Sequence, residues 1–132
     1  FKMVCGSDGY RTDKFPCWLF THRYYMEQTG YFLREDFIRN WVDQWLDQVF
    51  KAFDRKVYRG DIVIKHNHWV FNAMEKDNVA KNLQLREGPN KEKSDKIWHL
   101  TGNKRDEEVK MWEKVLNLKA NWAVVENKDR KV

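Results

Sequence analysis

The chain has 132 residues, which suffices for one domain but not for two of ordinary size, so we expect a single domain over 1–132. It carries 25 lysines and arginines against 20 acidic residues, and the net charge of +5 favours acidic partners such as phospholipid headgroups, glycans or nucleic acid. No apolar run approaches the roughly 20 residues of a membrane-spanning helix, so any action on a membrane is expected at its surface. The first residue is Phe1 rather than methionine, which suggests a processed product.

Residues 1–14 show no hydrophobic period and are predicted to form an irregular arm. Cys5 and Cys17 are candidates for a disulfide. In a secreted protein they would close a short loop that stabilises the fold by about 3 kcal/mol, and in the cytosol they would remain two thiols. Pro16 suits the first turn of a helix, and the apolar spacing after it predicts a short helix that ends at Gly30.

The strongest helical signal lies between Asp36 and Val57, where two heptad-spaced apolar stripes share almost no positions. They predict one long central helix beginning near Arg34, with Glu35 and Asp36 placed favourably at the positive end of its dipole. Its apolar surface is wider than one neighbour covers, so it must meet several partners or a membrane. We call its large rings the aromatic girdle: Phe37, Trp41, Trp45, Phe50 and Phe53.

The segment after the central helix has two interpretations. Gly60 and Asp61 suit a helix stop followed by an N-cap, which predicts a third helix over 62–76. The alternative is a hairpin over 57–65, because the residues that follow Asp61 are β-formers. We favour the helix, since a lone hairpin is marginally stable in water and the neighbouring chain has a helical pattern.

Residues 87–90 break the pattern, and Asp106 opens a last helix with Val109 and Trp112 on its inward side. The sequence therefore predicts an all-α fold, an up-and-down bundle of four to five helices with one long central helix.

Signals for catalysis and for metal binding are weak. His66 and His68 share a face only in a strand, and we predict a helix there. Asp43 and Asp47 are one helical turn apart and could serve as an acid–base pair on a glycan, but their face has the composition of a solvated helix surface. Aromatic and basic residues alternate over 65–71, yet stacking platforms for nucleic acid usually lie on sheets. We expect no enzyme activity, no metal, no cofactor and no nucleic-acid partner.

The segment from Arg55 to Asp61 resembles a turn in the abalone sperm acrosomal proteins, lysin and its fusagenic paralogue, in which an arginine, four residues, glycine and aspartate precede a helix. Upstream, the predicted helix containing Trp41 and Trp45 resembles the central helix of lysin, so the pattern covers residues 20–80. Lysin is more strongly basic and cysteine-poor, whereas milder charge and abundant tryptophan are closer to the fusagenic paralogue.

This resemblance implies a non-enzymatic protein of the sperm acrosomal vesicle, secreted to the cell surface, that promotes fusion of the sperm and egg plasma membranes. The alternative that it implies is lysin-like binding to an egg-surface glycoprotein and dissolution of the vitelline envelope.

The physical mechanism would use rings that emerge from the helical core. Such rings partition to the lipid headgroup boundary, and each nearby cation adds about 1 kcal/mol against an anionic membrane. Two such faces on one molecule, or one on each member of a homodimer, would bridge two bilayers. The expected surface for membrane or partner consists of Phe37, Trp41, Trp45, Phe50, Phe53, Trp69 and Phe71 with Arg39, Lys51 and Arg55.

Overall fold

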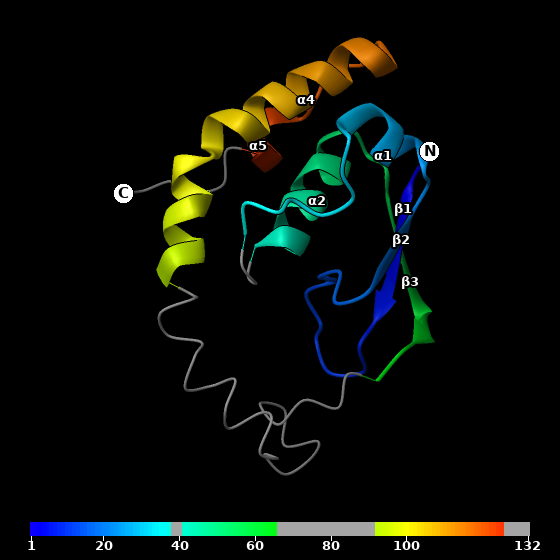
Figure 1. Ribbon diagram of the computed structural model, residues 1–132. Helices are drawn as coiled ribbons and strands as arrows, with labels where there is room; N and C mark the ends of the chain where they lie inside the picture. The colour runs from blue at the N-terminus through cyan, green and yellow to red at the C-terminus, as the bar shows by residue number, and fades with distance from the viewer. Residues whose placement is uncertain (38–40, 66–91, 126–132) are drawn as a thin grey trace.

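The computed structural model describes residues 1–37, 41–65 and 92–125. These residues form a three-stranded sheet beside a layer of helices (Figure 1). The fold is therefore mixed α/β, and the predicted all-α bundle is wrong. The strands are β1 (Met3–Ser7), β2 (Leu19–Thr21) and β3 (Lys56–Val63).

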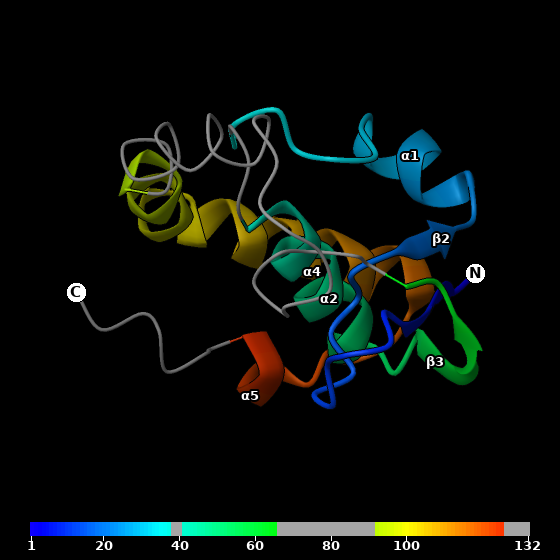
Figure 2. The same cartoon turned by 90° about the horizontal axis from the view of Figure 1, so that it is seen from below.

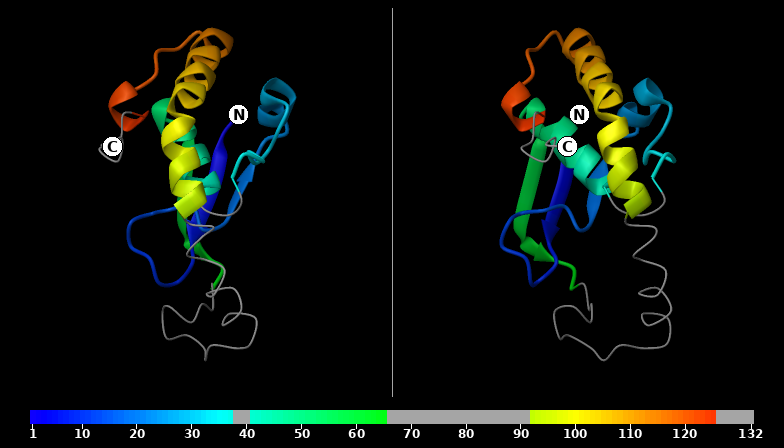
Figure 3. Two further views of the ribbon diagram at one scale, coloured as in Figure 1. Left: turned by 60° about the vertical axis from the view of Figure 1, so that its left-hand side comes forward. Right: turned by 90° about the vertical axis from the view of Figure 1, so that its left-hand side faces the viewer.

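The helices pack on one side of the sheet. α2 lies next to the sheet, and α4 and α5 lie beyond α2 (Figures 1 and 2). Seen from the helical side, α4 runs in front of α2 and the strands (Figure 3). Residues 92–100 are also helical. No helix in the described part of the chain is both long enough and apolar enough to span a bilayer. The labelled helices are α1 (Tyr24–Thr29), α2 (Val42–Ala52), α4 (Gly102–Leu116) and α5 (Trp122–Val125).

The sheet has the order β2-β1-β3, with β1 antiparallel to β2 and parallel to β3. Val4 pairs with Phe20 on one side and with Val57 on the other, so these three side chains share one face. Met3 and Cys5 alternate with Val4 and are fully buried on the opposite face. One face of the sheet therefore belongs to the core, and the other carries no helix among the described residues (Figure 1).

The expected irregular arm is wrong for residues 3–7, which form β1. The expected helix after Asp61 is also wrong as far as residue 63, because β3 continues through it. A lone hairpin is marginally stable, but β3 pairs with β1, about fifty residues earlier in the chain, rather than with an adjacent segment. That long-range partner supplies the stabilisation that a hairpin lacks.

The helix predicted between Pro16 and Gly30 is confirmed only in its second half. Residues Leu19–Thr21 form β2, and α1 then ends at Gly30, whose φ of 79° is left-handed and whose N–H donates to the Met26 carbonyl. Glycine adopts this conformation without a Cβ penalty, so the predicted stop is confirmed.

The central helix is shorter than predicted. α2 spans 11 residues and ends before Asp54, whose φ of 53° departs from helical geometry. It packs against α4, α5 and β3, and its rings also meet Tyr25 of α1 and Trp98 of the segment 92–100. The buried residues of α2 that form the centre of the core are Trp45, Leu46, Val49, Phe50 and Ala52.

Candidate functional site

The aromatic girdle lies in the core rather than on the surface. Trp41 is half-buried, stacks on Trp98 with ring centroids 5.1 Å apart, and donates its indole N–H to Asp95 at 2.5 Å. The four other rings are each less than a tenth exposed, so they offer little area to a membrane. These buried rings are Phe37, Trp45, Phe50 and Phe53.

The basic residues of the expected surface have internal partners. Lys51 forms an ion pair with Asp47 at 2.5 Å. The Arg55 guanidinium lies 5.3 Å from the centre of the Phe1 ring and donates to the Phe1 carbonyl at 2.8 Å. Among the described residues, the structure therefore does not gather the predicted aromatic and basic side chains into one exposed surface. Arg39, His66, His68, Trp69 and Phe71 lie outside the described residues.

A different set of apolar side chains is exposed, at one end of the sheet. They come from the loop after β1, from β2 and from the end of β3. Phe20 is 66% exposed, and Val63 and Ile64 are each 50% exposed, which is high for apolar side chains of this size. We use the name sheet-end surface for these exposed side chains together with the half-buried Trp18, which contacts Phe20: Tyr10, Trp18, Phe20, Ile62, Val63 and Ile64.

Trp18 is the centre of the sheet-end surface. Its indole rests on Gly6, where an added Cβ would lie 2.1 Å from the ring, so only glycine fits at this position. The indole N–H donates to the Ser7 carbonyl at 3.0 Å. On its other side the ring meets Phe20 edge-on, with centroids 5.9 Å apart. Phe20 is thus held on the open face of the sheet.

The end of β3 continues this surface through a bulge. The register passes from Arg59 to Val63 on β3 while β1 advances by one residue, so residues 60–62 bulge out of the strand. The Ile64 N–H then donates to the Ser7 carbonyl at 3.0 Å, which returns the chain to β1. Residues 62–64 are therefore exposed at the end of β3 rather than packed inside, with the Ile62 carbonyl near Gly6 and the Val63 side chain near Gly9.

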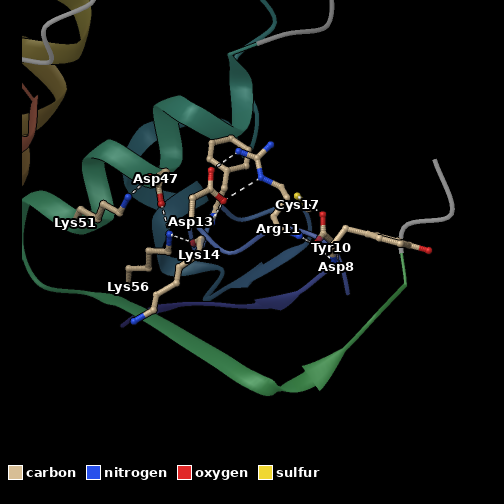
Figure 4. A network of polar contacts seen from close by, with 10 residues as sticks. Asp8, Tyr10, Arg11, Asp13, Lys14, Cys17, Asp47, Lys51 and Lys56 are labelled. Atoms are coloured by element: carbon tan, nitrogen blue, oxygen red, sulfur yellow. Dashed lines mark hydrogen bonds and ion pairs between the residues drawn. The ribbon is translucent and has the colours of Figure 1, made fainter. Parts of the chain in front are cut away.

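A hydrogen-bonded loop places Tyr10 next to the end of β3. The Asp8 carboxylate is buried and accepts the N–H groups of Tyr10 and Arg11 at 2.9 and 2.8 Å (Figure 4). The Cys17 thiol donates to the other Asp8 oxygen at 3.3 Å. Gly9 lies against Val63, with an added Cβ 3.5 Å from that side chain. The loop is therefore fixed to β3.

A buried ion pair joins this loop to the helical layer. The Lys56 ammonium on β3 donates to Asp47 on α2 at 2.5 Å and to the Lys14 carbonyl at 2.6 Å (Figure 4). The side chains of Asp47 and Lys56 are only 4% and 8% exposed. Asp43, one turn earlier on α2, has a pKa raised by burial. Asp47 is therefore a buried ion-pair partner, and the expectation that its helix face is solvated is wrong at this residue.

Charged side chains border the sheet-end surface. Arg59 holds Asp61 through two hydrogen bonds of 2.8 and 2.6 Å, and both side chains are more than half exposed. Arg11 lies over the Phe15 ring at 4.6 Å. Lys65 follows Ile64 directly and is exposed. Arg59 and Lys65 thus lie on either side of the apolar residues 62–64, and Arg59 has an acidic partner in Asp61.

Both cysteines are free thiols in the structure. Burial, followed by the hydrogen bond to the Asp8 carboxylate, raises the pKa of Cys17 to about 12. Because the thiolate is the reactive form, alkylation of Cys17 near pH 8 should be on the order of 100-fold slower in the folded protein than in the urea-unfolded chain. The rate of iodoacetamide labelling in a Cys5→Ala variant measures this directly. Similar rates in both states would contradict the Asp8–Cys17 contact.

Sequence reasoning missed the sheet-end surface because the decisive signal was interpreted as a helix. Three consecutive β-branched residues after Asp61 are typical of a strand, and the sequence already supported that alternative. Phe20 gave no comparable signal, since a single ring in a three-residue strand has no detectable period.

The segment from Arg55 to Asp61, which carries the resemblance to acrosomal proteins, lies largely in β3 rather than between two helices. In the described residues, no cluster of three or more histidine, cysteine, aspartate or glutamate side chains could hold a metal ion. No family model, no curated protein and no solved structure matches this chain.

Proposed function

We propose that this protein binds the surface of anionic lipid membranes through the sheet-end surface. The observation that supports the proposal is the exposure of large apolar side chains there: Phe20 at 66%, Val63 and Ile64 at 50%, Ile62 at 41% and Tyr10 at 36%. Exposed apolar clusters of this kind are characteristic of contacts with a membrane or a partner.

The geometry suits shallow insertion. The exposed side chains at 62–64 lie at the end of β3, where the bulge at 60–62 ends, so they can enter the headgroup boundary while the rest of the sheet stays outside. Trp18 and Phe20 add aromatic rings of the type that accumulate at that boundary. Moving a fully exposed aliphatic side chain from water into the membrane contributes about 1.5 to 3 kcal/mol. The half-exposed side chains here contribute correspondingly less.

Charge adds to this attraction. The protein carries a net charge of +5, and Arg59 and Lys65 flank the apolar run. A basic residue close to an anionic bilayer contributes about 1 kcal/mol, an effect that salt weakens. The negative charge of Asp61 offsets part of this electrostatic attraction. Apolar contact is therefore the larger contribution to the binding free energy, and the basic residues favour anionic lipids.

Co-sedimentation with vesicles tests the proposal. We expect binding to vesicles that contain phosphatidylserine and weaker binding to pure phosphatidylcholine. In the doubly substituted Val63→Asp, Ile64→Asp protein the affinity should fall at least about tenfold, because apolar area is lost and negative charge is added. Lipid dequenching in the same samples reports whether the bound protein also mixes bilayers.

The matched control replaces apolar residues that are as exposed but lie in the helical layer. Leu100 and Leu118 are 68% and 45% exposed, and Leu100→Asp, Leu118→Asp should bind vesicles like the unaltered protein. Equal losses of vesicle affinity in the two double variants would mean that binding depends on any exposed apolar side chain, and would contradict a specific role for the sheet-end surface. No binding to either type of vesicle would overturn the proposal.

A further inference from the structure

A second site lies between α4 and the end of α1 with the residues that follow it. It is a wide, solvent-open cavity of about 390 Å³, with room for a small molecule. α4 contributes Lys104, Glu107, Glu108 and Met111, whose spacing puts them on one helix face. The opposite wall includes Tyr31 and the other polar side chains Gln28 and Arg34.

The inner wall of this cavity is held in place by buried hydrogen bonds. Glu108 is 7% exposed and accepts the hydroxyl of Tyr25 at 2.5 Å and the indole N–H of Trp45 at 2.6 Å, together with the hydroxyl of Tyr31. Tyr31 in turn accepts a hydrogen bond from Arg34 at 3.2 Å. Polar groups fixed in this way lose little entropy when a ligand binds.

The position of Arg34 is fixed from two further directions. Its guanidinium lies 4.4 Å from the centre of the Trp45 ring and forms an ion pair with Asp36. Lys104 approaches the same carboxylate at 3.5 Å. The cations of the cavity wall are therefore already engaged with acidic groups, which reduces their attraction for a free anion.

Charge and hydrogen-bonding capacity together define the ligand. Two basic and two acidic side chains line the cavity, so neither a strong anion nor a strong cation finds a net complement there. Glu108, Arg34 and Lys104 are already paired, so the exposed Gln28 amide and Glu107 carboxylate supply the donor and the acceptor for a ligand, and a hydroxyl group is the ligand group that uses both. The Tyr31 ring and Met111 add apolar contact area.

We infer that this cavity binds a neutral sugar ring. Its open volume has room for a single hexose, its balanced charge gives no net attraction for a phosphorylated sugar, and the exposed side chains of Glu107 and Gln28 can meet ring hydroxyls. The inference is independent of membrane binding, because no residue of the cavity belongs to the sheet-end surface.

Titration followed by two-dimensional NMR tests the inference. Neutral methyl hexosides should shift the Trp45 indole N–H resonance saturably at millimolar concentration, because that N–H is bonded to Glu108 in the cavity wall. Inorganic phosphate and glycine, added as charged probes, should leave the resonance in place. Hexosides presented on a glycolipid in phosphatidylcholine vesicles form a second arm, which distinguishes free sugar from membrane-bound glycan.

Rim variants locate the binding. Glu107→Ala and Gln28→Ala remove exposed side chains and should each weaken binding about fivefold, the loss expected for one hydrogen bond. The control Lys110→Ala changes an exposed residue of α4 outside the cavity and should bind like the unaltered protein. Unchanged affinity in the rim variants, absence of any saturable hexoside shift, or tighter binding of phosphate would each overturn the inference.

Discussion

Replacing Glu108 with alanine is expected to lower the free energy of unfolding by about 4 kcal/mol. The Glu108 carboxylate accepts hydrogen bonds from Tyr25, Tyr31 and Trp45, which come from three different parts of the chain. Alanine would leave the buried donors of Tyr25 and Trp45 without their acceptor, and each buried unsatisfied donor costs about 1 to 3 kcal/mol, whereas the half-buried Tyr31 hydroxyl faces the open cavity. Urea unfolding followed by tryptophan fluorescence measures the loss.

Two variants control this prediction. Glu107→Ala removes the adjacent carboxylate, which is exposed, and should change stability by no more than about 0.5 kcal/mol. Glu108→Gln keeps one acceptor oxygen, so its free energy of unfolding should lie between those of Glu108→Ala and Glu107→Ala. If Glu108→Ala unfolds at the same urea concentration as Glu107→Ala, the buried network does not stabilise the fold as described.

Replacing Asp47 with alanine is expected to lower the free energy of unfolding by about 3 to 5 kcal/mol. The carboxylate neutralises Lys56, whose side chain is only 8% exposed, so its removal leaves a nearly buried ammonium without a counter-charge. The Lys14 carbonyl remains as an acceptor but carries no formal charge. The same unfolding assay applies.

A double substitution separates the charge from the packing. Asp47→Ala combined with Lys56→Met removes both charges, and it should recover most of the stability, because a buried ion pair replaced by apolar groups is often nearly neutral. As a surface control, Asp61→Ala removes the exposed partner of Arg59 and should leave the unfolding midpoint unchanged. A double variant as unstable as Asp47→Ala would contradict the ion-pair explanation.

The helical pattern at the C-terminal end of the described chain was predictable. Val109 and Trp112 were expected on the inward side of the last helix, and they are 0% and 1% exposed on α4. Their spacing continues through Leu116 over about two turns, which specifies both the helix and its buried side. Val115, which continues the same pattern, is 38% exposed near the end of α4, where the packing ends.

The strands were not predictable in the same way. β1 has five residues and β2 has three, which is too short for a reliable alternation. β3 looked unstable as a lone hairpin because its partner, β1, lies far away in the sequence. The sheet-end surface therefore depends on a pairing between distant segments.

The wide apolar face of the central helix shows which features the sequence determines and which depend on the tertiary structure. The amino-acid pattern by itself determined that Trp45 and Phe50 belong to a surface too broad for one neighbour. Tertiary packing alone decided what covers it: Trp45 meets Trp98 at 6.4 Å, and Phe50 meets Tyr25 at 5.3 Å, so several core partners replace the membrane. The physical reason is that periodicity records which side of a segment avoids water, whereas the neighbour that removes the water is chosen by contacts between distant parts of the chain.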